Sequence, residues 1–386
     1  MQPTDSYDLV IAGAGIIGAC VAWHATQRGL RVAVIDAKGP AAAASGASDG
    51  AVSVASKRPG LMANLADASL CYAREMAQHN GILKGIFHPR PTFIFARSAP
   101  ESAALDRLTR MLHDQSLSVT IHQDGAAQTS AISGLGKDIT RVIELQGEAH
   151  MLGYQATHAY LRAAKCDLFW PRSLEAYEPG PEGVRVFTSA GEMNCAQLVI
   201  ASGIGTMGLL PNVPMIARSG QLIVSDRGPA SEPNLPGPLT SAAYLLDKTA
   251  NGRGDAGLPV VIDPLRTGQV LIGSTREDHG TERQTDIATV RRLLHSAVGC
   301  LPRLAERRII RVFAGVRSAS LDGLPIVGAL PEEPNVVCAT GFEGDGICLS
   351  ALIGREIAAH LATGQSSPDL AALTPGRFSS QEAIPA

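Results

Sequence analysis

The 386-residue sequence has few aromatic side chains and little net charge. Aromatic residues make up only 4% of the chain, whereas 45% of its residues are hydrophobic and glycine occurs 40 times. This composition is typical of alanine- and glycine-rich α/β proteins rather than of disordered chains. The length allows two domains with a substantial core.

Strong charge of either sign is also missing. The chain has 33 Lys and Arg against 36 Asp and Glu, which gives a net charge of −3. A nucleic-acid or acidic-lipid partner requires a basic surface, so we expect neither partner.

The seven cysteines include no Cys-x-x-Cys pair, and their number is odd. We therefore expect no disulfide framework, no metal site and no iron–sulfur site.

The first residues lack a basic segment followed by an apolar one, and the apolar segment 9–23 is short and contains three glycines. These features predict a cytoplasmic chain with neither a signal peptide nor a membrane span.

A glycine turn near the N-terminus is the most informative motif. Gly13, Gly15 and Gly18 follow an apolar run at 7–12 and precede an apolar segment at 19–23. Such a strand, turn and helix bind a dinucleotide, because the glycines allow the tight turn, the approach of a pyrophosphate and close helix packing. Ile16 and Ile17 lie inside this turn. The alternative is a glycine-rich turn of purely structural role.

Asp36 supports the nucleotide interpretation. It ends the apolar run 30–35, about twenty residues beyond the glycines, where a carboxylate accepts both hydroxyls of an adenosine ribose. A carboxylate disfavours a 2′-phosphate, so FAD or NAD is favoured over NADP.

The periodicity predicts further elements along the chain. Predicted helices cover 61–79, 105–112, 156–164, 286–298 (stopped by Gly299) and 347–362 (stopped at 363–364). Predicted strands cover 92–95, 184–187, 197–201, 221–224, 260–263, 270–273 and 335–340. We expect an α/β protein with a Rossmann-like domain that binds the nucleotide (1–55, 140–215 and 310–375), which the family resemblance implies to be an FAD-binding domain. An α+β substrate domain on an antiparallel sheet (56–139 and 216–309) is inserted into it, and 376–386 form a tail.

Three further segments carry a family resemblance: the small-residue segment 44–51, the run 315–328 and the glycine turn 341–346. Together with the N-terminal turn and Asp36, they resemble the FAD-dependent D-amino-acid oxidase family. The similarity covers nearly the whole chain and is closest to the branch of glycine oxidase, the sarcosine oxidase β-subunit and the opine oxidase B-subunit. The stretch 48–60 is most similar to opine oxidase B-subunits.

The resemblance implies noncovalently bound FAD, because the covalent-flavin cysteine of monomeric sarcosine oxidases has no counterpart between Gly315 and Asp322. The second glycine turn would direct backbone N–H groups at the N1/O2 edge of the flavin. Beyond the N-terminal turn and Asp36, the implied cofactor-binding residues are Ala37, Ser45, Ala47, Ser48, Gly50, Ala51, Ala201, Gly203, Gly341, Gly344, Asp345, Gly346 and Ile347.

Two positions bear on catalysis by resemblance. Arg317 matches the arginine that pairs with the substrate carboxylate, a task that suits a guanidinium fork; the alternative is a salt-bridge arginine. Leu271 stands where oxygen-reactive sarcosine oxidases carry a lysine, which favours a dehydrogenase over an oxidase. Lys57, Arg58 and Arg74 either add positive charge near the pocket or a partner surface, or are solvated.

The family oxidises amines by hydride transfer to flavin N5, and water then hydrolyses the imine. We expect the catalytic subunit of an opine-type dehydrogenase, for example for octopine or nopaline, with partner subunits that hold further redox centres. The alternatives are a stand-alone glycine, D-amino-acid or hydroxyproline oxidase or dehydrogenase, and a flavin-binding scaffold subunit. The resemblance also allows FMN at an interface between subunits near His150 and His158, although ordinary histidines are the simpler interpretation.

Overall fold

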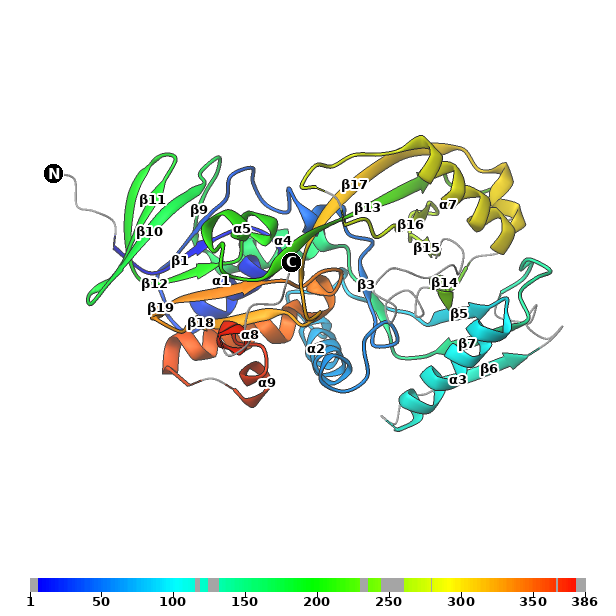
Figure 1. Ribbon diagram of the computed structural model, residues 1–386, viewed down its shortest axis with the longest axis horizontal. Coiled ribbons are helices and arrows are strands. Elements are labelled where there is room, and N and C mark those ends of the chain that lie inside the picture. The colour runs from blue at the N-terminus through cyan, green and yellow to red at the C-terminus, as the bar shows by residue number, and fades with distance from the viewer. Residues whose placement is uncertain are drawn as a thin grey trace.

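The computed structural model describes residues 6–114, 119–123, 132–229, 235–243, 260–278, 280–365 and 367–379. The molecule is elongated, with one large sheet in each half (Figure 1). Two long neighbouring strands, β13 (Met215–Ser225) and β17 (Ile309–Ser320), run between the halves. Residues 380–386 of the expected tail lie outside the described part of the chain.

The first sheet has eight strands, and its centre is parallel. Strand β12 pairs parallel with β1, β1 with β2, and β2 with β9. The first half of β12 pairs antiparallel with β11, and its second half pairs parallel with β19. The strands are β1 (Ser6–Ala12), β2 (Val32–Ile35), β9 (Asp167–Phe169), β10 (Leu174–Gly180), β11 (Gly183–Thr188), β12 (Gly191–Ile200), β18 (Ile326–Leu330) and β19 (Glu333–Thr340).

Four helices contribute buried residues to one hydrophobic core in this half, together with strands of the first sheet. They are α1 (Ile16–Thr26), α2 (Leu61–Ala77), α4 (Gly153–Ala164) and α8 (Gly346–Thr363). Small residues let α1 and α8 approach closely, since an added Cβ on Gly354 would lie 2.6 Å from the sulfur of Cys20. The strand residues Leu9 and Ile11 are fully buried in the same core. This packing fixes the starts of α1 and α8 at the end of the parallel strands.

The second sheet also has eight strands, in the order β17-β13-β16-β15-β14-β5-β7-β6. Its pairs are antiparallel except β14 with β5, which is parallel, so the sheet is mixed rather than wholly antiparallel. The remaining strands are β5 (Thr92–Ala96), β6 (Val119–Gln123), β7 (Arg141–Leu145), β14 (Leu239–Ser241), β15 (Val261–Pro264) and β16 (Val270–Gly273).

Two helices pack on opposite faces of this sheet. Helix α7 (Ile287–Cys300) shares a core with Phe93 and Phe95, whereas α3 (Ala99–Asp114) shares another with Ile94 and Ile143. Neighbouring strand residues point to opposite faces, which explains this division. Short elements complete the fold: β3 (Ala51–Val52), β4 (His88–Pro89), β8 (Ala149–His150), α5 (Thr206–Leu209), α9 (Pro368–Ala371), η1 (Ala44–Ala47), η3 (Gly203–Gly205), η4 (Pro302–Glu306) and η5 (Pro375–Phe378).

Most predicted elements are present, and the expected α/β fold class is confirmed. The prediction that Gly299 ends a helix is wrong, because α7 continues to Cys300 and Gly299 needs no positive φ. Leu301 caps the helix in a non-helical conformation directly before Pro302, as a following proline favours. Gly364 does end α8, with a left-handed φ of 71°.

Sheet membership does not follow the expected domain ranges. Strands β7 and β17 fall in ranges assigned to the FAD-binding domain but belong to the second sheet. Helix α2, from a range assigned to the substrate domain, packs in the core of the first half. The division into two domains therefore stays a prediction.

All seven cysteines are free thiols. Among the residues that the structure describes, no helix is both long and apolar enough for a membrane crossing. Within that same part of the chain, no group of three or more His, Cys, Asp or Glu side chains is placed to bind a metal ion.

Candidate functional site

The glycine turn after β1 shows three different steric demands. An added Cβ on Gly13, whose φ is +117°, would lie 2.3 Å from the carbonyl oxygen of Ala201. On Gly18 it would lie 2.0 Å from the Gly13 oxygen, so the third glycine serves close packing of α1 on β1. On Gly15 it would meet only Ser45 Oγ, at 3.2 Å, and would otherwise face an open pocket. Gly15 thus leaves the space that a pyrophosphate needs.

We call this cavity the nucleotide pocket. Asp36 and Arg317 both line it. Most of the predicted site residues line it: Gly13, Gly15, Ile16, Ile17, Asp36, Ser45, Ala47, Ser48, Ala201, Gly203, Arg317, Gly344, Gly346 and Ile347. Segments far apart in the sequence therefore converge on one cavity.

Asp36 is held by the backbone around it. One carboxylate oxygen accepts a hydrogen bond from Ala14 N at 2.8 Å, and the other accepts from Lys38 N at 2.8 Å and Gly39 N at 2.7 Å. Each carboxylate oxygen has two acceptor sites, so one site remains for a ribose hydroxyl, on the oxygen that accepts from Ala14 N. These contacts fix the orientation of the carboxylate in the pocket wall.

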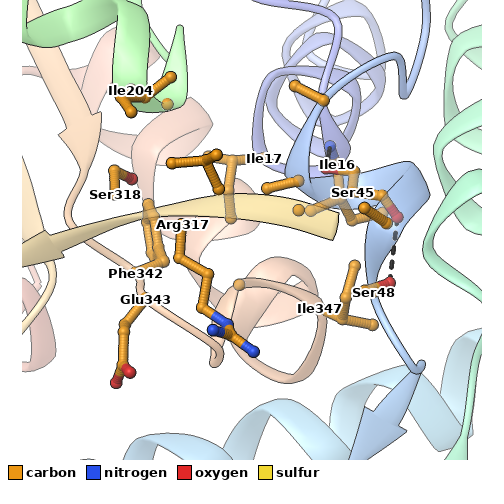
Figure 2. A pocket seen from close by; sticks show the side chains of 18 of the residues that line it. Ile16, Ile17, Ser45, Ser48, Ile204, Arg317, Ser318, Phe342, Glu343 and Ile347 are labelled. Carbon is orange, nitrogen blue, oxygen red and sulfur yellow. Dashed lines mark hydrogen bonds between the residues drawn. The ribbon is translucent and has the colours of Figure 1, made fainter. Parts of the chain in front are cut away.

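Ser45 and Ser48 lie in the pocket wall next to Ile16, at the start of α1 (Figure 2). Ser45 Oγ accepts a hydrogen bond from Ile16 N at 2.9 Å, and Ser48 Oγ donates to the Ser45 carbonyl at 3.0 Å. The small residues of η1 thereby bring the chain close to the start of α1.

Neither α1 nor α8 has a side-chain cap from its own N-cap residue, Gly15 or Asp345. Both helix starts meet the nucleotide pocket, where backbone N–H groups and the helix dipole favour an anion or an electron-rich group.

Arg317 projects from β17 into the nucleotide pocket (Figure 2). Its Nη1 donates to the carbonyls of Ser219 (3.3 Å) and Thr275 (3.2 Å), and its Nη2 donates to Ser274 Oγ (2.8 Å). All these partners are neutral, and within the described ranges no carboxylate forms an ion pair with Arg317. A half-buried guanidinium oriented by neutral groups is suited to bind an incoming carboxylate.

Glu343 is a pocket residue that the sequence analysis missed. It lines the nucleotide pocket with a left-handed φ of 48°. Its carboxylate forms ion pairs with Arg276 at 2.6 Å and with Arg218 at 3.4 Å. Arg218 also binds Asp278 through two hydrogen bonds, of 2.5 and 2.9 Å. The sequence signal was the acidic residue inside the second glycine turn, which we interpreted only as backbone geometry.

Asp345 has a different environment from the expected one. It does not line the nucleotide pocket, and its carboxylate lies 2.9 Å from Lys57 Nζ in an ion pair whose side chains are 13% and 3% exposed. Lys57 is therefore a buried structural partner of the second glycine turn rather than a solvated charge. Arg58 donates to the Asp322 carbonyl, and Arg74 donates to the Gly147 carbonyl.

Other predicted residues lie near the nucleotide pocket but do not line it: Gly18, Ala37, Gly50, Ala51, Gly341 and Leu271. Leu271 is buried in β16 and pairs with Val224, whereas Gly273 pairs with the lining residue Leu222. Residues 271 and 273 share one sheet face because strand side chains alternate, so Leu271 lies two positions beyond the pocket on the same face. His150 is buried, and His158 is exposed on α4.

Comparison with known proteins agrees with this geometry. The family model described as FAD dependent oxidoreductase matches residues 8–360. The chain is 26% identical to the hydrogen cyanide synthase subunit HcnC of Pseudomonas aeruginosa, over 90% of this chain and 91% of that protein. It is 22% identical to the B-subunit of opine oxidase from Rhizobium meliloti, over 97% and 99% of the two chains.

A solved structure shares the fold over almost the full length. Glycine oxidase from Geobacillus kaustophilus has a TM-score of 0.85 at 22% identity, covering 96% of this chain and 99% of that one. The arrangement of the two sheets is therefore common to both proteins.

Proposed function

Because this chain belongs to the FAD dependent oxidoreductase family, we propose that it oxidises the C–N bond of a carboxylate-bearing secondary amine. The substrate class is opine-type, such as octopine or nopaline, and the chain is the catalytic subunit of a multi-subunit dehydrogenase. The observation that carries this proposal is Arg317, a cation that lines the nucleotide pocket and whose described partners are all neutral.

The residues present suit FAD. Asp36 offers one remaining acceptor site to a hydroxyl of the adenosine ribose, and Gly15 leaves room for the pyrophosphate between α1 and Ser45. Gly344 leaves similar room next to Arg317, since an added Cβ there would meet only Arg317 Nε, at 3.8 Å. Bound FAD supplies the acceptor for a hydride from the carbon next to the amine nitrogen. We propose noncovalent binding, because residues 315–322 contain no cysteine.

Arg317 supplies orientation in this proposal. Its fork holds both oxygens of the substrate carboxylate and so fixes the direction of the neighbouring C–H bond. Ser274 Oγ and the two backbone carbonyls hold the guanidinium in place before the substrate arrives. Preorganised donors and acceptors of this kind lower the cost of reaching the reactive geometry. We assign no side chain as a base, because the neutral amine needs none.

The multi-subunit role rests on the similarity to proteins that are themselves named as subunits, HcnC and the B-subunit of opine oxidase. The dehydrogenase preference rests on Leu271, an apolar residue at the position of the lysine in oxygen-reactive relatives. FMN at an interface between subunits stays a prediction with no contact among the described residues to support it. Partner subunits would have to hold any further redox centre.

A substrate panel tests the proposal. The flavin-loaded protein is mixed without oxygen with octopine, nopaline, sarcosine, hydroxyproline, glycine and a D-amino acid, and loss of the visible flavin absorption is followed. Each reaction is repeated with a dye as acceptor and with co-expressed partner subunits. We expect the fastest bleaching with a secondary amine that bears a carboxylate. Bleaching by glycine or a D-amino acid alone would instead favour a stand-alone amino-acid oxidase, and no bleaching by any amine would favour a scaffold subunit.

A further inference from the structure

A second cavity, which we call the arginine pocket, lies apart from the nucleotide pocket and has a volume of about 670 Å³. Its lining residues come from β4, β8, the β15–β16 hairpin and the turn from α7 into η4. Of these elements, β15, β16 and α7 lie in the second half (Figure 1). The described residues that line it include five arginines and two histidines but no acidic residue. These basic residues are Arg90, Arg227, Arg266, Arg303, Arg307, His88 and His150.

The positive charge of Arg90 is balanced by a buried carboxylate. Arg90 forms an ion pair with the buried Asp263, with Nη1–Oδ1 at 2.7 Å and Nη2–Oδ2 at 2.8 Å. Arg266 has a different neighbour, since its Nη1 lies 2.9 Å from Nδ1 of His88, a group that cannot offset its charge. Within the described ranges, no acidic side chain forms an ion pair with Arg227 or Arg266. Arg227 and Arg266 therefore add positive charge to the pocket that no described acidic side chain balances through an ion pair.

His88 lies among these positive groups, next to Arg266. Its pKa is lowered first by burial and then by the positive groups Arg266, His150 and Arg90. A cluster of cations that disfavours protonation of an imidazole favours the binding of an anion by the same electrostatics.

We propose that the arginine pocket binds a small phosphate-bearing ligand. A phosphoryl group carries up to two negative charges and several acceptor oxygens, which suits guanidinium forks that converge from several segments. The volume lies within the range of small-molecule pockets, which is roughly 300–1,000 Å³. Neither the amine substrate nor the activity proposed above enters this inference.

A hydrogen-bond contact joins a lining residue of the arginine pocket to a lining residue of the nucleotide pocket. His150 lines the arginine pocket, and its Nε2 lies 2.9 Å from the carbonyl oxygen of Asp49, which lines the nucleotide pocket. Binding in the arginine pocket should thus perturb the absorption of a flavin bound on the other side of this contact.

The test uses FAD-saturated protein, so that the nucleotide pocket is filled. Pyrophosphate, orthophosphate and glycerol phosphate are titrated by calorimetry, and the thermal unfolding midpoint and flavin difference spectrum are recorded in parallel. We expect saturable binding of at least one probe with one site per chain, a higher midpoint and a small flavin shift. Tightest binding of glycerol phosphate would identify a phosphate ester, and tightest binding of pyrophosphate or orthophosphate would identify a free phosphate anion.

The double variant R227Q/R266Q should lose at least tenfold in affinity. The double-charge control is R185Q/R311Q, which removes two exposed arginines outside the pocket. Equal loss in both variants would show a mere effect of net charge and would overturn the proposal, as would non-saturable binding to the parent protein. If R227Q/R266Q does not fold, stoichiometry and competition among the probes on the parent protein decide the question.

Discussion

At the residue scale, the proposal that Arg317 binds the substrate carboxylate can be tested directly. We expect Arg317→Leu to lower the efficiency of flavin reduction by roughly thirty- to several-thousand-fold, because losing a buried charge-paired contact costs about 2–5 kcal/mol. Arg317→Lys should recover only part of this, since an ammonium cannot form the bidentate fork. Anaerobic stopped-flow reduction measures the effect.

The matched control for this prediction is Arg185→Leu, on the exposed surface of β11. It removes the same charge and should leave reduction unchanged. If Arg317→Leu reduces its flavin as efficiently as the parent chain, Arg317 does not hold the substrate.

Leu271 provides a second prediction at this scale. The reduced parent protein should react slowly with oxygen, because oxygen activation needs a positive charge to stabilise the first transferred electron. Leu271→Lys should accelerate the reaction, provided that burial does not lower the pKa of the new lysine so far that it loses its proton. Mixing reduced protein with oxygenated buffer measures both rates, with Leu271→Met as the uncharged control. Rapid reoxidation of the parent would contradict the dehydrogenase proposal.

At the element scale, the turn between β1 and α1 allows a test that separates folding from binding. We expect Gly15→Ala to remain folded but to lose most of its affinity for FAD, because an added Cβ meets only Ser45 Oγ and otherwise enters the pocket. Gly18→Ala should instead destabilise the fold, since its Cβ would lie 2.0 Å from the Gly13 oxygen. Flavin content and the midpoint of thermal unfolding distinguish the two effects. Full flavin content in Gly15→Ala would show that the pyrophosphate lies elsewhere.

Helix α1 also contains a buried titratable group. Burial, followed by Arg28 and Arg355, lowers the pKa of His24 to about 3. The unfolded chain protonates this histidine near pH 6.5, whereas the folded chain does so only near pH 3. Stability should therefore decline as the pH falls from about 6.5 towards 3, by up to about 1.4 kcal/mol per pH unit from this residue.

Denaturant unfolding between pH 4 and 8 measures this decline. His24→Phe, which retains a ring beside Tyr72, should show a flatter profile. The surface substitution His158→Phe serves as the control. An unchanged slope in His24→Phe would contradict the assignment.

Much of this element geometry was predictable because it depends on short local signals. The glycine turn, Asp36 and the turn before α8 impose backbone constraints that are visible in neighbouring residues. The Lys57–Asp345 and Arg276–Glu343 ion pairs were not predictable, because they join segments that only the tertiary fold brings together. Strand β17 was missed since its run 315–328 was interpreted as a family motif, although it continues a strand that begins at Ile309.

At the scale of the whole molecule, we propose that the nucleotide pocket holds FAD without a covalent bond. We expect the purified protein to be yellow and to release intact FAD on acid precipitation, because residues 315–322 contain no cysteine and the contacts available to FAD are noncovalent. Chromatography of the supernatant identifies the released flavin. Colour retained in the washed pellet would show a covalent bond.

The ladder between β13 and β17 has a mechanical consequence. The strands pair from Met215–Ser320 to Ser225–Ile309, over nearly the full length of both, and Gly220, Leu222 and Arg317 from this ladder line the nucleotide pocket. A hinge between the two halves would have to shear these hydrogen bonds and displace the arginine at the same time. The pairing of β13 with β17 should therefore oppose a hinge motion between the two halves, and the position of Arg317 in the nucleotide pocket depends on this pairing.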